Sequence, residues 1–290
     1  MKQLLILSGK GGTGKTTTAA AFIRFSEAKA IADCDVDAPN LHIVTNTKEE
    51  PENSVFYGSE KAYIDPEKCI GCGKCDYYCR FGAIRKQQNK YSIVDYACEG
   101  CGVCELVCPQ NAVSMKPDEA GSMSLFKEEK VFSTAKLKMG RGNSGKLVTE
   151  VKRAMNRSAE NTELAIIDGS PGIGCPVIAS VSGVDMVLIV AEPSMSGLSD
   201  LKRILQTASI LQTKAVVSVN KYDIDPEKTH EIEELCKNEN IPFVGKVPYD
   251  RSASRAINEG ISIADIDCPA REALYQVYLN TINILNEHKK

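Results

Sequence analysis

The chain has 290 residues, of which 43% are hydrophobic and 25% are charged, and its formal net charge is −3. This length predicts one large domain with a smaller one, and the slightly acidic balance argues against nucleic acid as a partner. No apolar run approaches the roughly 18 residues that cross a bilayer, and the apolar stretch near the N-terminus is too short for a signal peptide. We therefore expect a cytoplasmic protein with no membrane span.

The N-terminal segment predicts a strand, a glycine-rich loop and a helix in succession. The strand covers 3–8, the loop reads Gly-Lys-Gly-Gly-Thr-Gly-Lys-Thr over 9–16, and an alanine-rich helix continues to about residue 26. In such a loop the backbone N–H groups face nucleotide phosphates, Lys15 reaches the β- and γ-phosphates, and the Thr16 hydroxyl binds Mg²⁺. We therefore expect ATP or ADP with Mg²⁺ at this loop. The loop residues predicted to bind it are Gly9, Lys10, Gly11, Gly12, Thr13, Gly14, Lys15, Thr16 and Thr17.

The segment 59–117 contains two near-identical cysteine runs. They read Cys69-x2-Cys72-x2-Cys75-x3-Cys79 and Cys98-x2-Cys101-x2-Cys104-x3-Cys108-Pro109. This is the ligand spacing of a bacterial ferredoxin with two [4Fe–4S] clusters, in which the fourth cysteine of each run ligates the other cluster. By that rule one cluster takes Cys69, Cys72, Cys75 and Cys108, and the second takes Cys98, Cys101, Cys104 and Cys79. Zinc is the alternative, because two C-x2-C pairs can form a site with four cysteine ligands.

Downstream of the cysteines the pattern changes to alternating strands and helices. Residues 122–139 predict extended, hairpin-like structure, and a helix follows from about 146 to 159. The remaining predicted elements are strands at 164–168, 185–191, 214–220 and 242–247, and helices at 197–212, 226–239 and 270–287. Apolar strands separated by helices are typical of a mostly parallel sheet covered by helices on both faces. Ligands bind at the carboxyl ends of such strands, where the short strand 30–33 ends at Asp33 and the strand 164–168 ends at Asp168.

A lysine directly after the first glycine makes the phosphate loop more specific. Lys10 in Lys-Gly-Gly-Thr-Gly-Lys-Thr resembles the deviant loop of the MinD/ParA/Mrp superfamily of P-loop ATPases, to which the nitrogenase iron protein is related. In that family this lysine crosses a dimer interface to the partner subunit's nucleotide, so the resemblance implies an ATP-dependent homodimer. It also implies catalytic roles for Lys10, Lys15 and Asp35, with Asp35 orienting the attacking water.

Further matches to the superfamily follow in chain order. Asp33, in Asp-Cys-Asp, matches a position near Mg²⁺, and Asp168, in Asp-Gly-Ser-Pro-Gly, matches the aspartate that binds Mg²⁺ through water. Asn220, at the end of a strand, resembles the residue that contacts adenine in the family. The loop containing Pro248 and Asp250 resembles a second segment on the base side.

The resemblance covers the chain outside the cysteine-rich segment and implies a discontinuous domain. A P-loop ATPase domain is expected over 1–58 and 118–290, interrupted by a small α+β ferredoxin domain over 59–117. Cys175 lies seven residues beyond Asp168, and a cysteine at this spacing in the nitrogenase iron protein ligates a cluster shared by two subunits. Cys175 could therefore hold a dimer-bridging centre, or it could pack as a small apolar residue.

The combination of motifs leaves three functions open. The first is a slow, partner-stimulated ATPase that couples its nucleotide state to iron–sulfur or metallocofactor transfer on a client metalloprotein. The second is an ATP-gated electron donor to a partner redox enzyme. The third, a MinD/ParA-type positioning ATPase, is less favoured because the helix 270–287 has apolar spacing typical of a core helix, unlike a basic membrane-binding helix.

Overall fold

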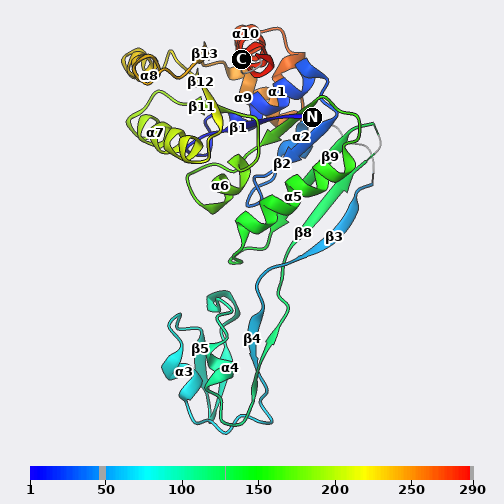
Figure 1. Ribbon diagram of the computed structural model, residues 1–290, viewed down its shortest axis with the longest axis vertical. Coiled ribbons are helices and arrows are strands. Elements are labelled where there is room, and N and C mark those ends of the chain that lie inside the picture. The colour runs from blue at the N-terminus through cyan, green and yellow to red at the C-terminus, as the bar shows by residue number, and fades with distance from the viewer. Residues whose placement is uncertain (46–49, 128, 288–290) are drawn as a thin grey trace. The chain divides into compact units, whose positions relative to one another are not determined.

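The computed structural model describes residues 1–45, 50–127 and 129–287, and Figure 1 shows the course of the chain. The chain divides into two compact units. The unit that we call the sheet unit consists of Met1–Asn53, Met123–Lys136 and Gly145–Lys290. The other, the cysteine unit, consists of Ser54–Ser122 and Leu137–Ser144. The cysteine unit thus extends beyond the predicted segment 59–117 on both sides and includes a separate stretch that precedes Gly145.

Thirteen strands occur in the described part of the chain. They are β1 (Lys2–Leu7), β2 (Ala30–Asp33), β3 (Glu52–Tyr57), β4 (Lys61–Ile64), β5 (Ile84–Gln87), β6 (Lys90–Ile93), β7 (Val113–Lys116), β8 (Glu119–Phe126), β9 (Val131–Leu137), β10 (Leu164–Asp168), β11 (Met186–Ala191), β12 (Lys214–Asn220) and β13 (Phe243–Val247). The α-helices are α1 (Lys15–Ser26), α2 (Leu41–Thr45), α3 (Lys74–Tyr78), α4 (Val103–Leu106), α5 (Ser144–Ser158), α6 (Cys175–Val181), α7 (Met195–Ile210), α8 (Pro226–Asn238), α9 (Arg251–Asn258) and α10 (Pro269–Asn286). Two short 3-10 helices lie at Asp95–Ala97 and Ile263–Asp265.

Nine strands form one sheet, in the order β13-β12-β11-β1-β10-β2-β9-β8-β3. The pairs from β13 to β9 are parallel. Figure 1 shows α1 and α10 on one side of the central strands and α6 and α7 on the other. The predicted mostly parallel sheet with helices on both faces is confirmed. Because parallel strands present their carboxyl ends at the same edge, the loops after β1, β2 and β10 meet there.

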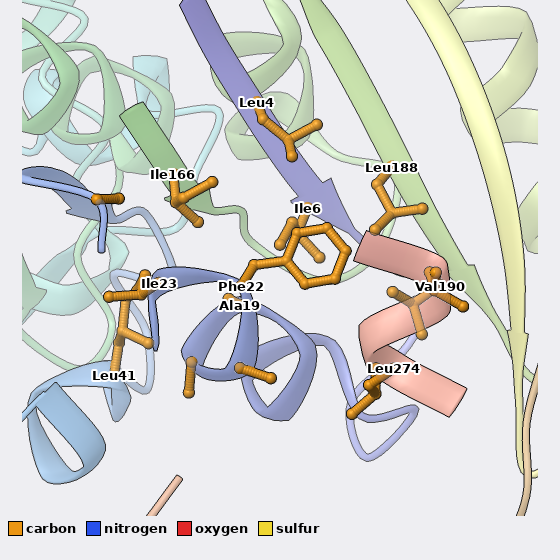
Figure 2. Packing of buried hydrophobic residues seen from close by; sticks show 14 of the residues in the cluster. Leu4, Ile6, Ala19, Phe22, Ile23, Leu41, Ile166, Leu188, Val190 and Leu274 are labelled. Carbon is orange, nitrogen blue, oxygen red and sulfur yellow. The ribbon is translucent and has the colours of Figure 1, made fainter. Parts of the chain in front are cut away.

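The core on the α1 side is built by strict alternation along β1. Leu4 and Ile6 point toward α1, while Leu5, which lies between them, points to the opposite face. Figure 2 shows Phe22 of α1 beside Ile6, in one cluster with Leu188 of β11 and Leu274 of α10. Phe22 is fully buried, and its ring meets Tyr278 edge to face at 5.2 Å between centroids. An aromatic residue of α1 therefore packs against both the sheet and α10.

Replacing Phe22 by alanine is expected to lower the free energy of unfolding by about 3–5 kcal/mol, because the vacated volume is surrounded on all sides. Chemical denaturation of the nucleotide-free protein measures this change. The matched control is Ile210→Ala at the exposed end of α7, where 73% of the residue is accessible and a change within about 0.5 kcal/mol is expected. Equal effects of the two substitutions would contradict this account of the core.

The predicted strands and helices are present within a few residues of their expected ends. Several elements were not predicted: α2, β3, α6 and α9, and in the cysteine unit α3, α4, β4 and β6. The helices among them are short and offer too few turns for a periodic pattern, and β3 is exposed at every position except Phe56. In the described residues, no helix combines the length and apolarity that crossing a membrane requires.

Candidate functional sites

The phosphate loop joins the end of β1 to α1 in the conformation that its glycines allow. Gly14, at φ 97°, directly precedes α1, and a Cβ atom there would lie 2.2 Å from Nδ2 of Asn220. Only glycine accommodates both this backbone angle and this approach. The amide of Asn220 in turn donates a hydrogen bond to the Thr13 carbonyl oxygen at 2.7 Å. The loop is therefore held by the end of β12 as well as by its own helix.

Three predicted carboxylates surround the lysine of this loop. Nζ of Lys15 lies 2.6 Å from Oδ1 of Asp168 and 3.7 Å from Oδ2 of Asp35. The Thr16 hydroxyl donates to the other oxygen of Asp168 at 2.7 Å. Asp33 is opposite Asp168 in the register of β2 and β10, and both are fully buried. The fold thus brings together residues about 150 positions apart that the sequence analysis had assigned to one Mg²⁺ and phosphate site.

Burial and mutual charge govern the ionisation of this group. Desolvation and the neighbouring charge of Asp168 raise the pKa of Asp33 to about 7, although two backbone N–H groups of Asn40 and Leu41 stabilise its ionised form. Burial by itself lowers the pKa of Lys15, but the surrounding carboxylates outweigh it and the net pKa is raised. The site therefore has more buried carboxylates than cationic side chains, as expected where a divalent cation binds.

A cavity of about 590 Å³ opens directly over the loop. Its walls include the phosphate-loop residues Lys10, Gly11, Gly12, Gly14, Lys15, Thr16 and Thr17, together with Asp35, Ser170, Asn220, Pro248 and Asp250. The glycine-rich loop and its two lysines along this wall fit the phosphates of a nucleotide ligand.

Lys10 is held within its own subunit by residues that the sequence analysis missed. Its ammonium lies 2.6 Å from Oε2 of Glu192 and within 3.4 Å of the hydroxyls of Ser194 and Ser196. Glu192 also pairs with Lys221 at 3.4 Å. Burial by itself raises the pKa of Glu192, but the two lysines outweigh it and leave the pKa below its ordinary value. The available signal was the position of Glu192, which directly follows the carboxyl end of a buried parallel strand.

The three residues predicted on the base side are all at the cavity wall, but their side chains have structural partners. Asn220 bonds the phosphate loop as described above. Asp250 caps the start of α9 by accepting from the backbone N–H of Ser252 at 2.8 Å, and this bond holds its pKa below the usual range. Pro248 lines the cavity beside it. Their predicted contacts with adenine stay predictions.

The eight clustered cysteines line two separate cavities in the cysteine unit. One cavity is lined by Cys69, Cys72, Cys75 and Cys108. The other is lined by Cys79, Cys98, Cys101 and Cys104. Each set of four therefore combines three cysteines of one run with the last cysteine of the other. This is the partition predicted from the ligand spacing of a two-cluster ferredoxin.

The two cysteine cavities are related by an internal repeat. Gly73 and Gly102 precede α3 and α4 with φ angles of 78° and 76°, so each run turns sharply before its third cysteine. The N–H of Ala83 donates to Sγ of Cys79 at 3.4 Å, and that of Ala112 donates to Sγ of Cys108 at 3.2 Å. N–H donors to sulfur stabilise thiolate ligands and tune an iron–sulfur cluster. The donor set therefore fits two [4Fe–4S] clusters.

Single metal ions were tested separately. In the described ranges, no three His, Cys, Asp or Glu side chains are grouped closely enough for one metal ion. Four thiolates around one Zn²⁺ would lie about 3.8 Å apart, since each Zn–S bond is about 2.3 Å.

Cys175 is exposed at the start of α6, so the expectation that it packs as a buried residue is wrong, and its metal role stays a prediction. Cys34 is fully buried, and burial raises the pKa of its thiol.

Comparison with known proteins places these sites in context. Residues 4–263 match the family model described as the CobQ/CobB/MinD/ParA nucleotide binding domain. An uncharacterized protein of Methanocaldococcus jannaschii is 31% identical over 283 residues, which cover 95% of each chain. An iron–sulfur cluster carrier protein of Pyrococcus furiosus is 23% identical over 304 residues, covering 99% of this chain and 88% of that protein.

Solved structures share the fold at lower identity. The septum site-determining protein MinD of Pyrococcus horikoshii, in complex with Mg-ADP, aligns with a TM-score of 0.58 and 15% identity over 98% of this chain and 97% of that one. MinD in the MinC:MinD complex of Aquifex aeolicus aligns with a TM-score of 0.55 and 17% identity over 100% and 99% of the two chains. At this identity the likeness shows the fold alone.

Proposed function

Because the chain belongs to the CobQ/CobB/MinD/ParA nucleotide-binding family and is a MinD/ParA-type ATPase, we propose that it couples its nucleotide state to iron–sulfur chemistry. The specific proposal is transfer of an iron–sulfur or other metallocofactor centre to a client metalloprotein. The observation that carries the iron–sulfur part of the proposal is the division of eight cysteines into two sets of four within the same chain. The relatives that bear the name iron–sulfur cluster carrier protein support transfer of such a centre.

In the nucleotide site the chain's own residues perform three tasks. Lys15 exchanges its contacts with Asp168 and Asp35 for the β- and γ-phosphates, and the hydroxyl of Thr16 and the carboxylate of Asp168 are the residues that would hold Mg²⁺. Asp35, half-buried at the cavity wall, orients the water that attacks the terminal phosphate. Lys10 exchanges its pairing with Glu192 for the partner subunit's nucleotide, which makes the ATP-bound state a dimer.

In the cysteine unit, one set of ligands is Cys69, Cys72, Cys75 and Cys108, and the other is Cys98, Cys101, Cys104 and Cys79. Two [4Fe–4S] clusters held there supply one-electron transfer. Backbone N–H groups at Ala83 and Ala112 hold the sulfur atoms of the two exchanged ligands in place. This interleaving favours resident clusters, and for that reason an ATP-gated electron donor is the second candidate function.

One experiment separates the two functions. The protein is reconstituted anaerobically with iron and sulfide, and the EPR spectrum of the reduced clusters and the iron content are measured with and without Mg-ATP, in wild type and Cys175→Ala. A labile iron signal beyond the two clusters that disappears in Cys175→Ala supports the carrier. Two signals that respond to Mg-ATP equally in both proteins support the electron donor. Reconstituted protein without any cluster signal rejects both.

Lys10→Ala is expected to leave nucleotide binding to one subunit within a few-fold but to lower hydrolysis by about 10³-fold or more, the size of effect that a cation supplied across an interface has on phosphoryl transfer. The measurement is the ATPase rate as a function of protein concentration, together with the mass of the Mg-ATP-bound particle in solution. Glu192→Gln is the companion variant, because it removes the competing partner of Lys10 and is expected to favour the dimer. A Lys10→Ala rate equal to wild type would contradict a role in trans.

A further inference from the structure

Helix α5 contacts both ends of helix α6. A Cβ atom on Gly145, in the first turn of α5, would lie 3.2 Å from the carbonyl oxygen of Cys175, in the first turn of α6. Further along α5, the side chain of Lys152 reaches the carboxyl end of α6. The two helices are therefore in register along the length of α6.

Lys152 is a buried lysine whose three donors are all used by one helix end. Only 6% of it is exposed, and Nζ donates to the carbonyl oxygens of Ala179 at 3.2 Å, Ser180 at 2.7 Å and Ser182 at 2.6 Å. These carbonyls belong to the last turn of α6, which has no further intrahelical donors and carries the negative end of the helix dipole. Among the described residues Lys152 makes no ion pair with a carboxylate. A buried ammonium that loses its acceptors is costly, because its charge is then left without hydrogen bonds. Lys152 therefore holds the carboxyl end of α6 in place against α5.

The fixed helix α6 continues directly from the nucleotide site. Its first residue, Cys175, follows the loop that begins at Asp168, the carboxylate that holds Lys15 and Thr16. Within this loop the Gly172 N–H donates to the Ser8 carbonyl oxygen at 3.1 Å, next to the phosphate loop. A change in the contacts of Asp168 on nucleotide binding therefore acts on a short loop that leads straight to α6.

The amino end of α5 is continuous with the cysteine unit. Arg141 lies three residues before α5 and belongs, with the stretch 137–144, to that unit. Its guanidinium pairs with both Asp118 and Asp95, the latter being the first residue of the 3-10 helix that immediately precedes Cys98. Cys98 is one of the proposed cluster ligands. The start of α5 is thus tied, through Arg141, to the backbone beside a cysteine ligand.

We propose that α5 transmits the nucleotide state to the cysteine unit, with Lys152 in the middle of α5 and Arg141 just before its first residue as the positioning residues. The proposal rests on the proposed function, since it explains how the two sites of one chain are coupled. Lys152 keeps α5 aligned with α6, so a displacement of the Asp168 loop moves both helices together. Arg141 passes the movement of the α5 start to the segment before Cys98. Such coupling is reciprocal, so the state of the cysteine unit also alters nucleotide affinity.

Hydrogen exchange with mass spectrometry, on anaerobically reconstituted protein with and without Mg-ATP, tests the proposal. In wild type, Mg-ATP is expected to change exchange at 9–18, in α6, and about fivefold or more at 137–144, the lower range of typical coupling. Lys152→Met, which keeps the length of the side chain but has no donors, keeps the change at 9–18 and loses that at 137–144. Lys152→Arg, which keeps the charge and the donors, retains both.

The control is Arg153→Met on the same helix, which removes an exposed charge that pairs, among the described residues, only with Glu150, and it is expected to behave as wild type. If Lys152→Met does not fold, Arg141→Met tests the segment before α5: the changes at 9–18 and in α6 persist, and the change at 137–144 is lost. A response at 137–144 that survives both Lys152→Met and Arg141→Met overturns the proposal, as does a wild type that responds at 9–18 but not at 137–144. Cluster EPR reports separately on the proposed function, because exchange at 137–144 can respond to Mg-ATP even where the clusters do not.

Discussion

Lys15→Met is expected to lower the rate of ATP hydrolysis by about 10²-fold or more, the loss typical for removing one preorganised donor to a developing charge. Lys15 is the buried cation of the site, 2.6 Å from Asp168 and 3.7 Å from Asp35, and it lines the cavity where the phosphates are proposed to bind. Methionine fills the same space without the charge. Steady-state ATPase measurements and nucleotide titration separate the loss of turnover from the loss of binding.

The same substitution has a predicted cost in stability. Without Lys15, the fully buried carboxylates of Asp168 and Asp33 lose their cation, and breaking such a pair lowers the free energy of unfolding by about 3–5 kcal/mol. The double variant Lys15→Met with Asp168→Asn is expected to recover part of that stability and none of the activity. Lys214→Met, at the amino end of β12 and away from the cavity, is the control with normal hydrolysis. A Lys15→Met protein that hydrolyses ATP at the wild-type rate would refute the site.

Two double cysteine variants are expected to retain different amounts of iron, depending on which cysteines bind the same cluster. Cys72→Ala with Cys108→Ala removes two ligands of one cavity, so about 4 of the roughly 8 iron atoms of two clusters are lost. Cys101→Ala with Cys108→Ala removes one ligand from each cavity, so both clusters are damaged and most of the iron is lost. Iron analysis and EPR on reconstituted protein measure both outcomes.

The comparison is internally controlled because both variants contain Cys108→Ala and differ by one exposed cysteine of equivalent position in the repeat. If each run bound its own cluster, the pattern would reverse, and Cys101→Ala with Cys108→Ala would retain half of the iron. Binding of about two zinc ions and no iron in the wild type would favour the zinc alternative. The three results are distinct in one assay.

Much of the architecture could be predicted from local patterns. Strands β10 and β11 are buried at nearly every position, so their sequences are continuous apolar runs that indicate a parallel sheet. The phosphate loop could be recognised from the sequence because the strand, the glycines and Lys15 are contiguous. The elements that were not predicted, such as α6, are short and are formed mainly by contacts with other segments.

The sequence by itself determined the chemistry of this protein: which residues can bind phosphate, which cysteines are spaced for clusters, and that parallel strands place Asp33 and Asp168 at one edge. Only the tertiary structure decided which partners those groups have. Glu192 holds Lys10, Asn220 bonds the phosphate loop, and Lys152 caps α6. The physical reason is that a side chain's type and spacing fix what it can bind, whereas long-range packing fixes which donor or acceptor lies within 3 Å of it.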